Sequence, residues 1–234
     1  MLINILLMEA PFAEKLLLAL VWIAALLPAL TFHEWAHGYT AYTLGDSTAK
    51  ADGRLSLNPL DHLDPYGALR MVLIGFGWAK PVPINTRNFK KPKRDIALTS
   101  IAGPLANFVL AFFCVLFGVL FLNFALPRYG FTPTIEIIYT LLEYSAIINL
   151  GLGLFNLIPL PPLDGSNVLM SLLPPKMAMQ YSKIRYYSHY IFLALIILSR
   201  LPDAISPLSL LGDVRNAIYD GFWEISLRIL SWFS

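Results

Sequence analysis

The feature that most constrains this chain is a stretch without charged residues from Ile96 to Pro127, which is 32 positions long. A helix needs only about 20 mainly apolar residues to cross the hydrocarbon core of a bilayer. The 234-residue chain is 57% hydrophobic and only 14% charged, and that charged fraction is about half of what an ordinary water-soluble domain carries. The sequence therefore predicts an all-α polytopic membrane protein. The net charge of +2 gives no indication of a nucleic-acid partner.

Two further apolar stretches lack charged residues, one from Leu16 to His33 and one from Tyr144 to Leu163. A weaker one lies between Arg185 and Arg200. From these stretches we expect spanning helices at about 14–44, 97–126, 134–157 and 180–201. The first three belong to a predicted membrane-embedded core formed by residues 1–175.

The C-terminal part, residues 176–234, is expected to add the fourth span and a helix of a different kind. Residues 208–233 mix five charged side chains with Leu, Ile and Trp. This pattern is typical of an amphipathic helix that lies at the membrane interface. A fifth span is the alternative for this segment.

Lys and Arg concentrate in the connection from Gly45 to Asp95, which holds nine of them against five Asp. The connection between the second and third predicted spans holds only Arg128. Because cytoplasmic connections of membrane proteins carry an excess of Lys and Arg, we expect residues 45–95 to be cytoplasmic and the N-terminus to lie outside. The end of the first span then lies in the cytoplasmic third of the bilayer.

An H-E-x-x-H motif, His33-Glu34-Trp35-Ala36-His37, ends the first predicted span. The two histidines are four residues apart and share one helical face, so each can place a nitrogen about 2.0–2.1 Å from one metal ion. Glu34 is placed to take a proton from a metal-bound water and to pass it to the leaving amine. The alternative is a pair of interior histidines that are bonded to neighbouring helices.

Catalytic zinc sites usually have three protein ligands and a water, so the motif needs a further ligand. Asp164 ends the charge-free stretch of the third span, on the same predicted side of the membrane as the motif. The prolines before it stop the helix and leave backbone groups that are tolerated at membrane depth only against protein or a water-filled cavity. Asp164 could also cap a helix over residues 165–173. The other candidates, interpreted as a loop residue and an interfacial residue, are His62 and His189.

Two further motifs follow H-E-x-x-H along the chain. They are Gly103-Pro104-Leu105-Ala106-Asn107 in the second span and an N-x-x-P-x-P-x-L-D-G sequence from Asn156 to Gly165. Together the motifs resemble those of the site-2 protease family of intramembrane zinc metalloproteases, over about residues 14–175. Many bacterial members carry a PDZ domain, for which the connection 45–95 is too short. The chain therefore resembles a compact member without one.

The resemblance implies one zinc ion per chain with three protein ligands, which are His33, His37 and Asp164. It also implies that Glu34 is the catalytic base and that Asn156 holds the substrate backbone or the oxyanion. We add Asn107 to the expected substrate-binding residues. Family members hydrolyse peptide bonds of transmembrane substrates, here near the cytoplasmic side of the bilayer. The expected partners are thus a transmembrane protein or peptide and the lipid bilayer, and the expected location is a prokaryotic inner membrane.

An apolar but interrupted segment within the first connection, from Met71 to Ile84, is too short and too rich in Gly and Pro to span. We hypothesise a short membrane-dipping β-hairpin whose exposed edge binds an extended substrate by adding a strand. Gly75 and Gly77 would allow the two backbones to approach closely. A plain interfacial loop is the alternative.

Two other classes of function fit parts of the pattern. A catalytically silent relative that acts as a membrane binding protein or chaperone would be expected to lack a catalytic residue, and none is missing from the motifs. A zinc transporter would be expected to show several ligand clusters along a path, whereas the sequence shows one. The sequence therefore favours an intramembrane zinc metalloprotease.

Overall fold

The computed structural model describes residues 5, 8–67, 79–198 and 209–232. Within them, three helices are long and apolar enough to cross a membrane. They are α2 (Phe12–Thr43), α6 (Pro92–Tyr129) and α7 (Pro133–Asn156). The predicted all-α polytopic fold is confirmed, and the three helices coincide with the spans expected at about 14–44, 97–126 and 134–157.

Proline and glycine set the limits of α6 and α7. Both helices begin with a proline, at a position where the missing N–H would have no partner within the helix. Thr132 caps α7, because its hydroxyl accepts a hydrogen bond from the N–H of Ile135 at 3.3 Å. Helix α6 ends at Tyr129 and is followed by Gly130, whose φ of +67° lies in the left-handed region that favours glycine. The two helices are therefore separated by a connection of only a few residues.

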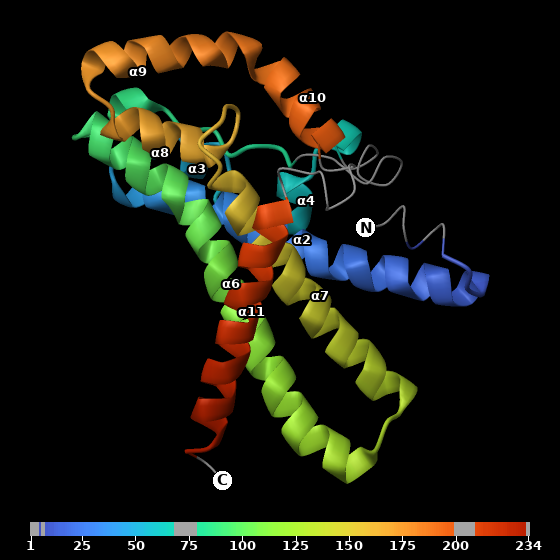
Figure 1. Cartoon of the computed structure of the whole chain (residues 1–234). Coiled ribbons are helices and arrows are strands. Elements are labelled where there is room, and N and C mark those ends of the chain that lie inside the picture. Colours follow the sequence, from blue (N-terminus) through green and yellow to red (C-terminus); the bar gives the residue numbers. More distant parts are fainter. Residues whose placement is uncertain (1–4, 6–7, 68–78, 199–208, 233–234) are drawn as a thin grey trace.

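Helices α6 and α7 form an antiparallel pair, and α2 packs against both of them (Figure 1). Trp22 and Leu26 of α2 are buried against a row of α7 side chains, which are Tyr144, Ile148 and Leu152. This packing brings the second half of α2 next to the beginning of α6 and the end of α7. The metal-ligand candidates of the sequence lie at this meeting point.

One face of α6 carries a stripe of large apolar side chains that the fold leaves uncovered. The stripe is formed by Leu105, Val109, Phe113, Phe117 and Phe124, which are 45–63% exposed. Water-soluble proteins rarely leave such a continuous apolar patch in contact with solvent. Lipid chains are the environment that suits this face.

Helix α11 (Ser209–Leu230) is the amphipathic C-terminal helix expected from the sequence. It runs along α6 and α7 (Figure 1). Phe222 and Trp223 pack against a buried cluster of Val115, Val119 and Ala146, while Asp220 and Glu224 are exposed. Its contact face is thus aromatic, and its depth relative to the bilayer stays a prediction.

Shorter elements connect these helices. Between α2 and α6 lie α3 (Thr48–Ala51), α4 (Pro59–His62) and η1 (Thr86–Asn88), and after α7 come α8 (Asp164–Leu172), α9 (Pro175–Ser182), η2 (Lys183–Tyr187) and α10 (Ser188–Leu198). The fourth span expected at 180–201 falls on α9, η2 and α10, and its end lies outside the described residues. It therefore stays a prediction.

The first part of the hypothesised hairpin, residues 71–78, lies outside the described part of the chain. The residues that flank this gap are paired, because Leu63 and Ala79 form an isolated antiparallel β-bridge. The N–H of Lys80 also donates to the carbonyl oxygen of His62 at 2.8 Å. The hairpin itself stays a prediction.

Candidate metal centre

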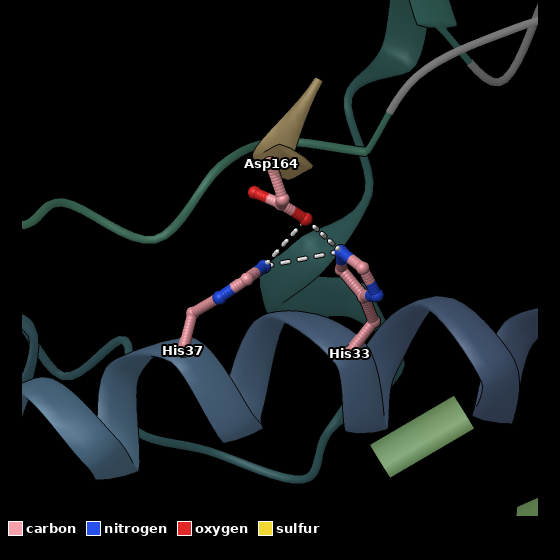
Figure 2. A group of neighbouring side chains, drawn as sticks. All are labelled: His33, His37 and Asp164. Carbon is pink, nitrogen blue, oxygen red and sulfur yellow. Dashed lines mark hydrogen bonds and ion pairs between the residues drawn. The ribbon is translucent and has the colours of Figure 1, made fainter. Parts of the chain in front are cut away.

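The two histidines of the H-E-x-x-H motif and Asp164 meet at one point, although α2 supplies the first two and α8 the third (Figure 2). The Nε2 atoms of His33 and His37 are 3.1 Å apart. Oδ2 of Asp164 lies 3.2 Å from each of them. A tetrahedral ion bound at about 2.0–2.1 Å requires donor atoms about 3.3–3.4 Å apart. The triangle of donors is therefore close to the size that zinc needs.

Each histidine is held by a hydrogen bond from its other ring nitrogen. Nδ1 of His33 donates to the side-chain oxygen of Asn107 at 2.6 Å, and Nδ1 of His37 donates to the carbonyl oxygen of Thr99 at 2.7 Å. Because both acceptors are carbonyl oxygens, the hydrogen must lie on Nδ1 of each ring. Nε2 of each neutral ring then presents a lone pair to the centre of the triangle, as metal-binding histidines do.

The third donor atom of this arrangement is Oδ2 of Asp164. Oδ2 is buried and accepts no hydrogen bond among the described residues. A buried carboxylate oxygen without a hydrogen-bond donor is costly unless a cation compensates it. Three lone-pair atoms that face one another form the donor set of a divalent metal site, and two imidazoles with one carboxylate suit zinc. The residues present therefore fit a zinc ion.

The alternative interpretation of Asp164 as a helix cap is wrong. Helix α8 begins at Asp164 itself, and its N-cap is Leu163, which makes no side-chain capping bond. The following residue explains why α8 lies so close to the end of α7. A Cβ atom on Gly165 would lie 2.2 Å from the carbonyl oxygen of Leu157, so only glycine fits there.

Helix α6 forms the back of the metal centre through Thr99, Gly103 and Asn107, which are spaced four residues apart and share one face. A Cβ atom on Gly103 would lie 2.4 Å from Nε2 of His37 and 2.8 Å from Cε1 of His33. Glycine therefore lets the backbone of α6 approach both rings. Asn107 is completely buried.

The side-chain amide of Asn107 makes all its hydrogen bonds within the protein. Its nitrogen donates to the carbonyl oxygen of Ala29 at 3.0 Å and to the side-chain oxygen of Asn149 at 2.7 Å. Asn149 in turn donates to the carbonyl oxygen of Ser145 at 2.8 Å. The structure thus places Asn107 behind His33, and not where the sequence interpretation expected a substrate contact.

A pocket of about 410 Å³ opens in front of the metal-ligand candidates. Its lining includes Glu34 and Asn156, the predicted base and the predicted substrate-binding residue. The side-chain nitrogen of Asn156 donates to the carbonyl oxygen of Leu152 at 3.0 Å. Apolar side chains of Leu30, Leu152 and Phe155 also line the pocket. The pocket therefore offers a mainly apolar surface with a few polar groups beside the metal centre.

The segment from Ala79 to Ile84 lines the other side of this pocket. The N–H of Val82 donates to Oε2 of Glu34 at 3.0 Å, so the segment directly orients the predicted base. Arg54 donates to the carbonyl oxygen of Lys80 at 2.9 Å from outside the pocket. These bonds tie the segment to α2 and to the rest of the connection between α2 and α6.

Asp46 anchors the end of the same segment. Its side chain is completely buried and accepts hydrogen bonds from the N–H of Asn85 at 2.7 Å and from the amide of Asn88 at 2.8 Å. Thr48 donates to it as well. Burial raises the pKa of Asp46, but the bonds from Thr48, Asn88 and Asn85 lower it by more, so its pKa lies below the ordinary value.

The remaining candidates of the sequence lie elsewhere. His62 is buried in the first connection, where Nε2 of its ring is hydrogen-bonded to the carbonyl oxygen of Ser56 at 2.7 Å. His62 ends the short helix α4, so its interpretation as a loop residue is wrong, although it does lie in the first connection. The side chain of His189 and both predicted hairpin glycines, Gly75 and Gly77, fall outside the described residues.

Comparison with known proteins gives one family and several relatives. The model of peptidase family M50 matches residues 126–199. A Bacillus subtilis protein named "Putative zinc metalloprotease YwhC" is 42% identical over 178 residues, which cover 75% of this chain and 79% of that protein. "Putative zinc metalloprotease Rip2" of Mycolicibacterium smegmatis is 29% identical over 180 residues, which cover 75% of this chain and 66% of that protein. No solved structure matches the chain significantly.

Proposed function

The chain belongs to peptidase family M50, the site-2 protease family of zinc metalloproteases, and we propose that it cleaves transmembrane proteins near the cytoplasmic side of the bilayer. It is an integral membrane zinc metalloendopeptidase with three apolar helices that are long enough to span. The observation that carries the proposal is the meeting of His33, His37, Asp164 and Glu34 in one pocket at the ends of these helices.

We propose that His33, His37 and Asp164 hold one zinc ion per chain. Their donor atoms form a compact triangle, and the hydrogen bonds of both histidines leave Nε2 free. Zinc bound by such ligands polarises a substrate carbonyl group and makes a water molecule nucleophilic near neutral pH. The bonds from Asn107 and Thr99 fix the ring orientations on which this ligand set depends.

Glu34 is the proposed general base. Its Oε2 accepts the N–H of Val82, which leaves Oε1 to take a proton from the attacking water. Glu34 then donates this proton to the nitrogen of the leaving amine as the peptide bond breaks. The products are a new carboxylate and a new amine, so one water molecule is consumed for each bond that is cut.

The substrate backbone is proposed to lie between Asn156 and the segment from Ala79 to Ile84. In this segment Pro81 and Pro83 lack an N–H, and the N–H groups of Lys80 and Val82 are already bonded. Arg54 donates to the carbonyl oxygens of Lys80 and Pro81, so an extended substrate would donate its own N–H groups chiefly to those of Val82 and Pro83. We propose that Gly75 and Gly77 extend this edge. Unchanged cleavage by a Gly77→Pro variant would contradict the strand-pairing part of the proposal.

The orientation of the site follows from the charge of the connections. Nine Lys and Arg residues lie between Gly45 and Asp95, the connection whose segment from Ala79 to Ile84 lines the pocket. The positive-inside rule supports our proposal that this connection, and with it the metal centre, lies towards the cytoplasm. We propose a prokaryotic inner membrane as the location, with a transmembrane protein as the substrate.

Cleavage of single-span peptides by the purified protein in detergent tests the proposed function. We expect the wild type to cut such peptides and Glu34→Gln to leave them intact, because glutamine cannot accept the proton. Glu136→Gln is the matched control, since Glu136 is exposed at the far end of α7, and it should cut like the wild type. Equal cleavage by Glu34→Gln and the wild type would contradict the assignment of the base.

A further inference from the structure

A second pocket, of about 280 Å³, opens next to the pocket of the metal centre. Four residues form walls of both pockets, which are Ile84, Thr99, Ser100 and Asn167. The second pocket is therefore a continuation of the first. Phe89, Ile96 and Met170 give it a mainly apolar interior.

The position of this second pocket along α6 shows in which direction it extends. Gly103 lies against the two histidines, Thr99 and Ser100 line both pockets, and Ile96 lines only the second. From Gly103 to Ile96 the helix rises by about 10 Å, towards its N-terminus. An extended peptide covers that distance in about three residues. The charge-free stretch begins at Ile96, so the second pocket lies where α6 leaves its apolar segment.

Arg185 gives the rim of the second pocket a positive charge, and the described residues that line this pocket include no carboxylate. The guanidinium group of Arg185 donates to the side-chain oxygen of Asn167, a neutral amide. Lys93, one helical turn before Ile96, donates to the carbonyl oxygen of Leu173 at 3.4 Å. Among the described residues, neither cation forms an ion pair, whereas the neighbouring Arg94 is paired with Asp95 at 2.7 Å. Arg185 can therefore pair with an acidic group of a ligand in the pocket, and Lys93 adds positive charge nearby on α6.

We propose that the second pocket binds the part of the substrate on the cytoplasmic side of the scissile bond and selects an acidic side chain about three residues from that bond. This inference rests on the proposed protease function. The apolar interior takes the side chains nearest the bond, and Arg185 at the rim pairs with the acidic one. A carboxylate is a stronger partner for a guanidinium group than the amide of Asn167.

Such a pocket makes the enzyme selective among membrane proteins. The cytoplasmic flanks of spanning helices are usually enriched in Lys and Arg, which Arg185 at the rim repels. Substrates with an acidic cytoplasmic flank are thereby distinguished from the large majority of single-span proteins. The pocket thus defines a substrate class by charge.

The test uses three otherwise identical single-span peptides with Asp, Asn or Lys at the third residue on the cytoplasmic side of the cleavage site. For the wild type, we expect kcat/KM to be about five- to tenfold higher with Asp than with Lys, the size of a partly exposed ion pair. Arg185→Glu should reverse this order. Lys183→Glu changes an exposed residue of η2 that does not line either pocket, and it should keep the wild-type order.

The Asn peptide distinguishes a failure of the acidic subsite from a failure of the proposed protease function. Similar cleavage of this peptide by all three proteins shows that the metal centre is intact in each variant. An Asp-to-Lys ratio that stays the same in Arg185→Glu would then overturn the acidic subsite while leaving the protease function in place. If the wild type cuts none of the three peptides, the result contradicts the proposed function and the subsite with it. Moving Asp along the flank should give the fastest cleavage near the third residue.

Discussion

Asn107 accepts a hydrogen bond from Nδ1 of His33 at 2.6 Å, although 74 positions separate the two residues in the chain. The same amide donates to Ala29 and to Asn149, so one buried side chain joins α2, α6 and α7 behind the metal centre. A side chain whose hydrogen bonds are all made within the protein is suited to holding a metal-binding residue in position. We therefore infer that Asn107 positions His33, in place of the substrate contact expected from the sequence.

Replacement of Asn107 by Ala removes the acceptor that fixes the ring of His33. We expect the zinc affinity to fall by about 10- to 100-fold, as is typical when the partner of a metal-binding histidine is lost. Competition with a chelator measures this affinity. Asn123→Ala is the control, because Asn123 lies in the same helix and its side chain donates, among the described residues, to the carbonyl oxygen of Val119 alone. Equal affinities in the two variants would show that Asn107 does not position His33.

Gly103→Ala places a methyl group where the ring of His37 now lies. The Cβ atom would be 2.4 Å from Nε2 of His37, so the ring must move out of the ligand triangle. We expect zinc content and peptide cleavage to be lost together. In Gly118→Ala the nearest neighbour is Cε2 of Tyr139 at 3.9 Å, and this variant should keep both. Full zinc content in Gly103→Ala would contradict the close packing of α6 on the histidines.

Val82→Pro removes the N–H that orients Glu34. Val82 already precedes a proline, so its backbone is confined to the extended region in which proline also fits. A hydrogen bond to a charged group contributes about 1.5–3 kcal/mol, so we expect kcat to fall by at least about tenfold, with little change in KM. Val82→Ala keeps the N–H and should keep most of kcat. Steady-state kinetics with one peptide measures both variants. An equal loss of kcat in Val82→Pro and Val82→Ala would contradict the role of the Val82 N–H in positioning Glu34.

The anchor formed by Asp46 should depend on pH. Because its pKa in the folded protein is lowered, its contribution to stability is fully present above the unfolded pKa of about 3.9 and is lost as the pH falls through the lower folded value. We expect the unfolding temperature of Asp46→Asn to be below that of the wild type at pH 7, with the gap closing below about pH 4. Asp52→Asn, at an exposed site, should show no gap. A gap for Asp46→Asn that is independent of pH would contradict this account.

The sequence predicted the long elements well, because their signal is local. A charge-free stretch such as Ile96 to Pro127 requires no knowledge of its neighbours, and helices α2, α6 and α7 appear where such stretches lie. The donors His33, His37 and Asp164 were also predictable, since their residue types and motifs carry the chemistry. The structure brings these three together in one triangle.

The supporting contacts were not predictable, because they depend on packing. The partner of His37 is a backbone carbonyl group, that of Thr99, and any residue type offers one. Asn149 does carry a signal in the sequence, since a polar side chain within an apolar span usually has a specific partner. For α11, the amphipathic pattern predicted a helix but not that Phe222 and Trp223 would pack against α6 and α7.

Zinc content, determined beside peptide cleavage in the same preparations, tests the central claim that His33, His37 and Asp164 form a catalytic zinc site. We predict about one zinc ion per chain in the wild type, as expected for one set of three protein ligands. Glu34→Gln should retain this zinc but not cut peptides, and Asp164→Asn should lose both zinc and cleavage. Wild-type zinc content in Asp164→Asn, or cleavage by a preparation of it that holds no zinc, would contradict the claim.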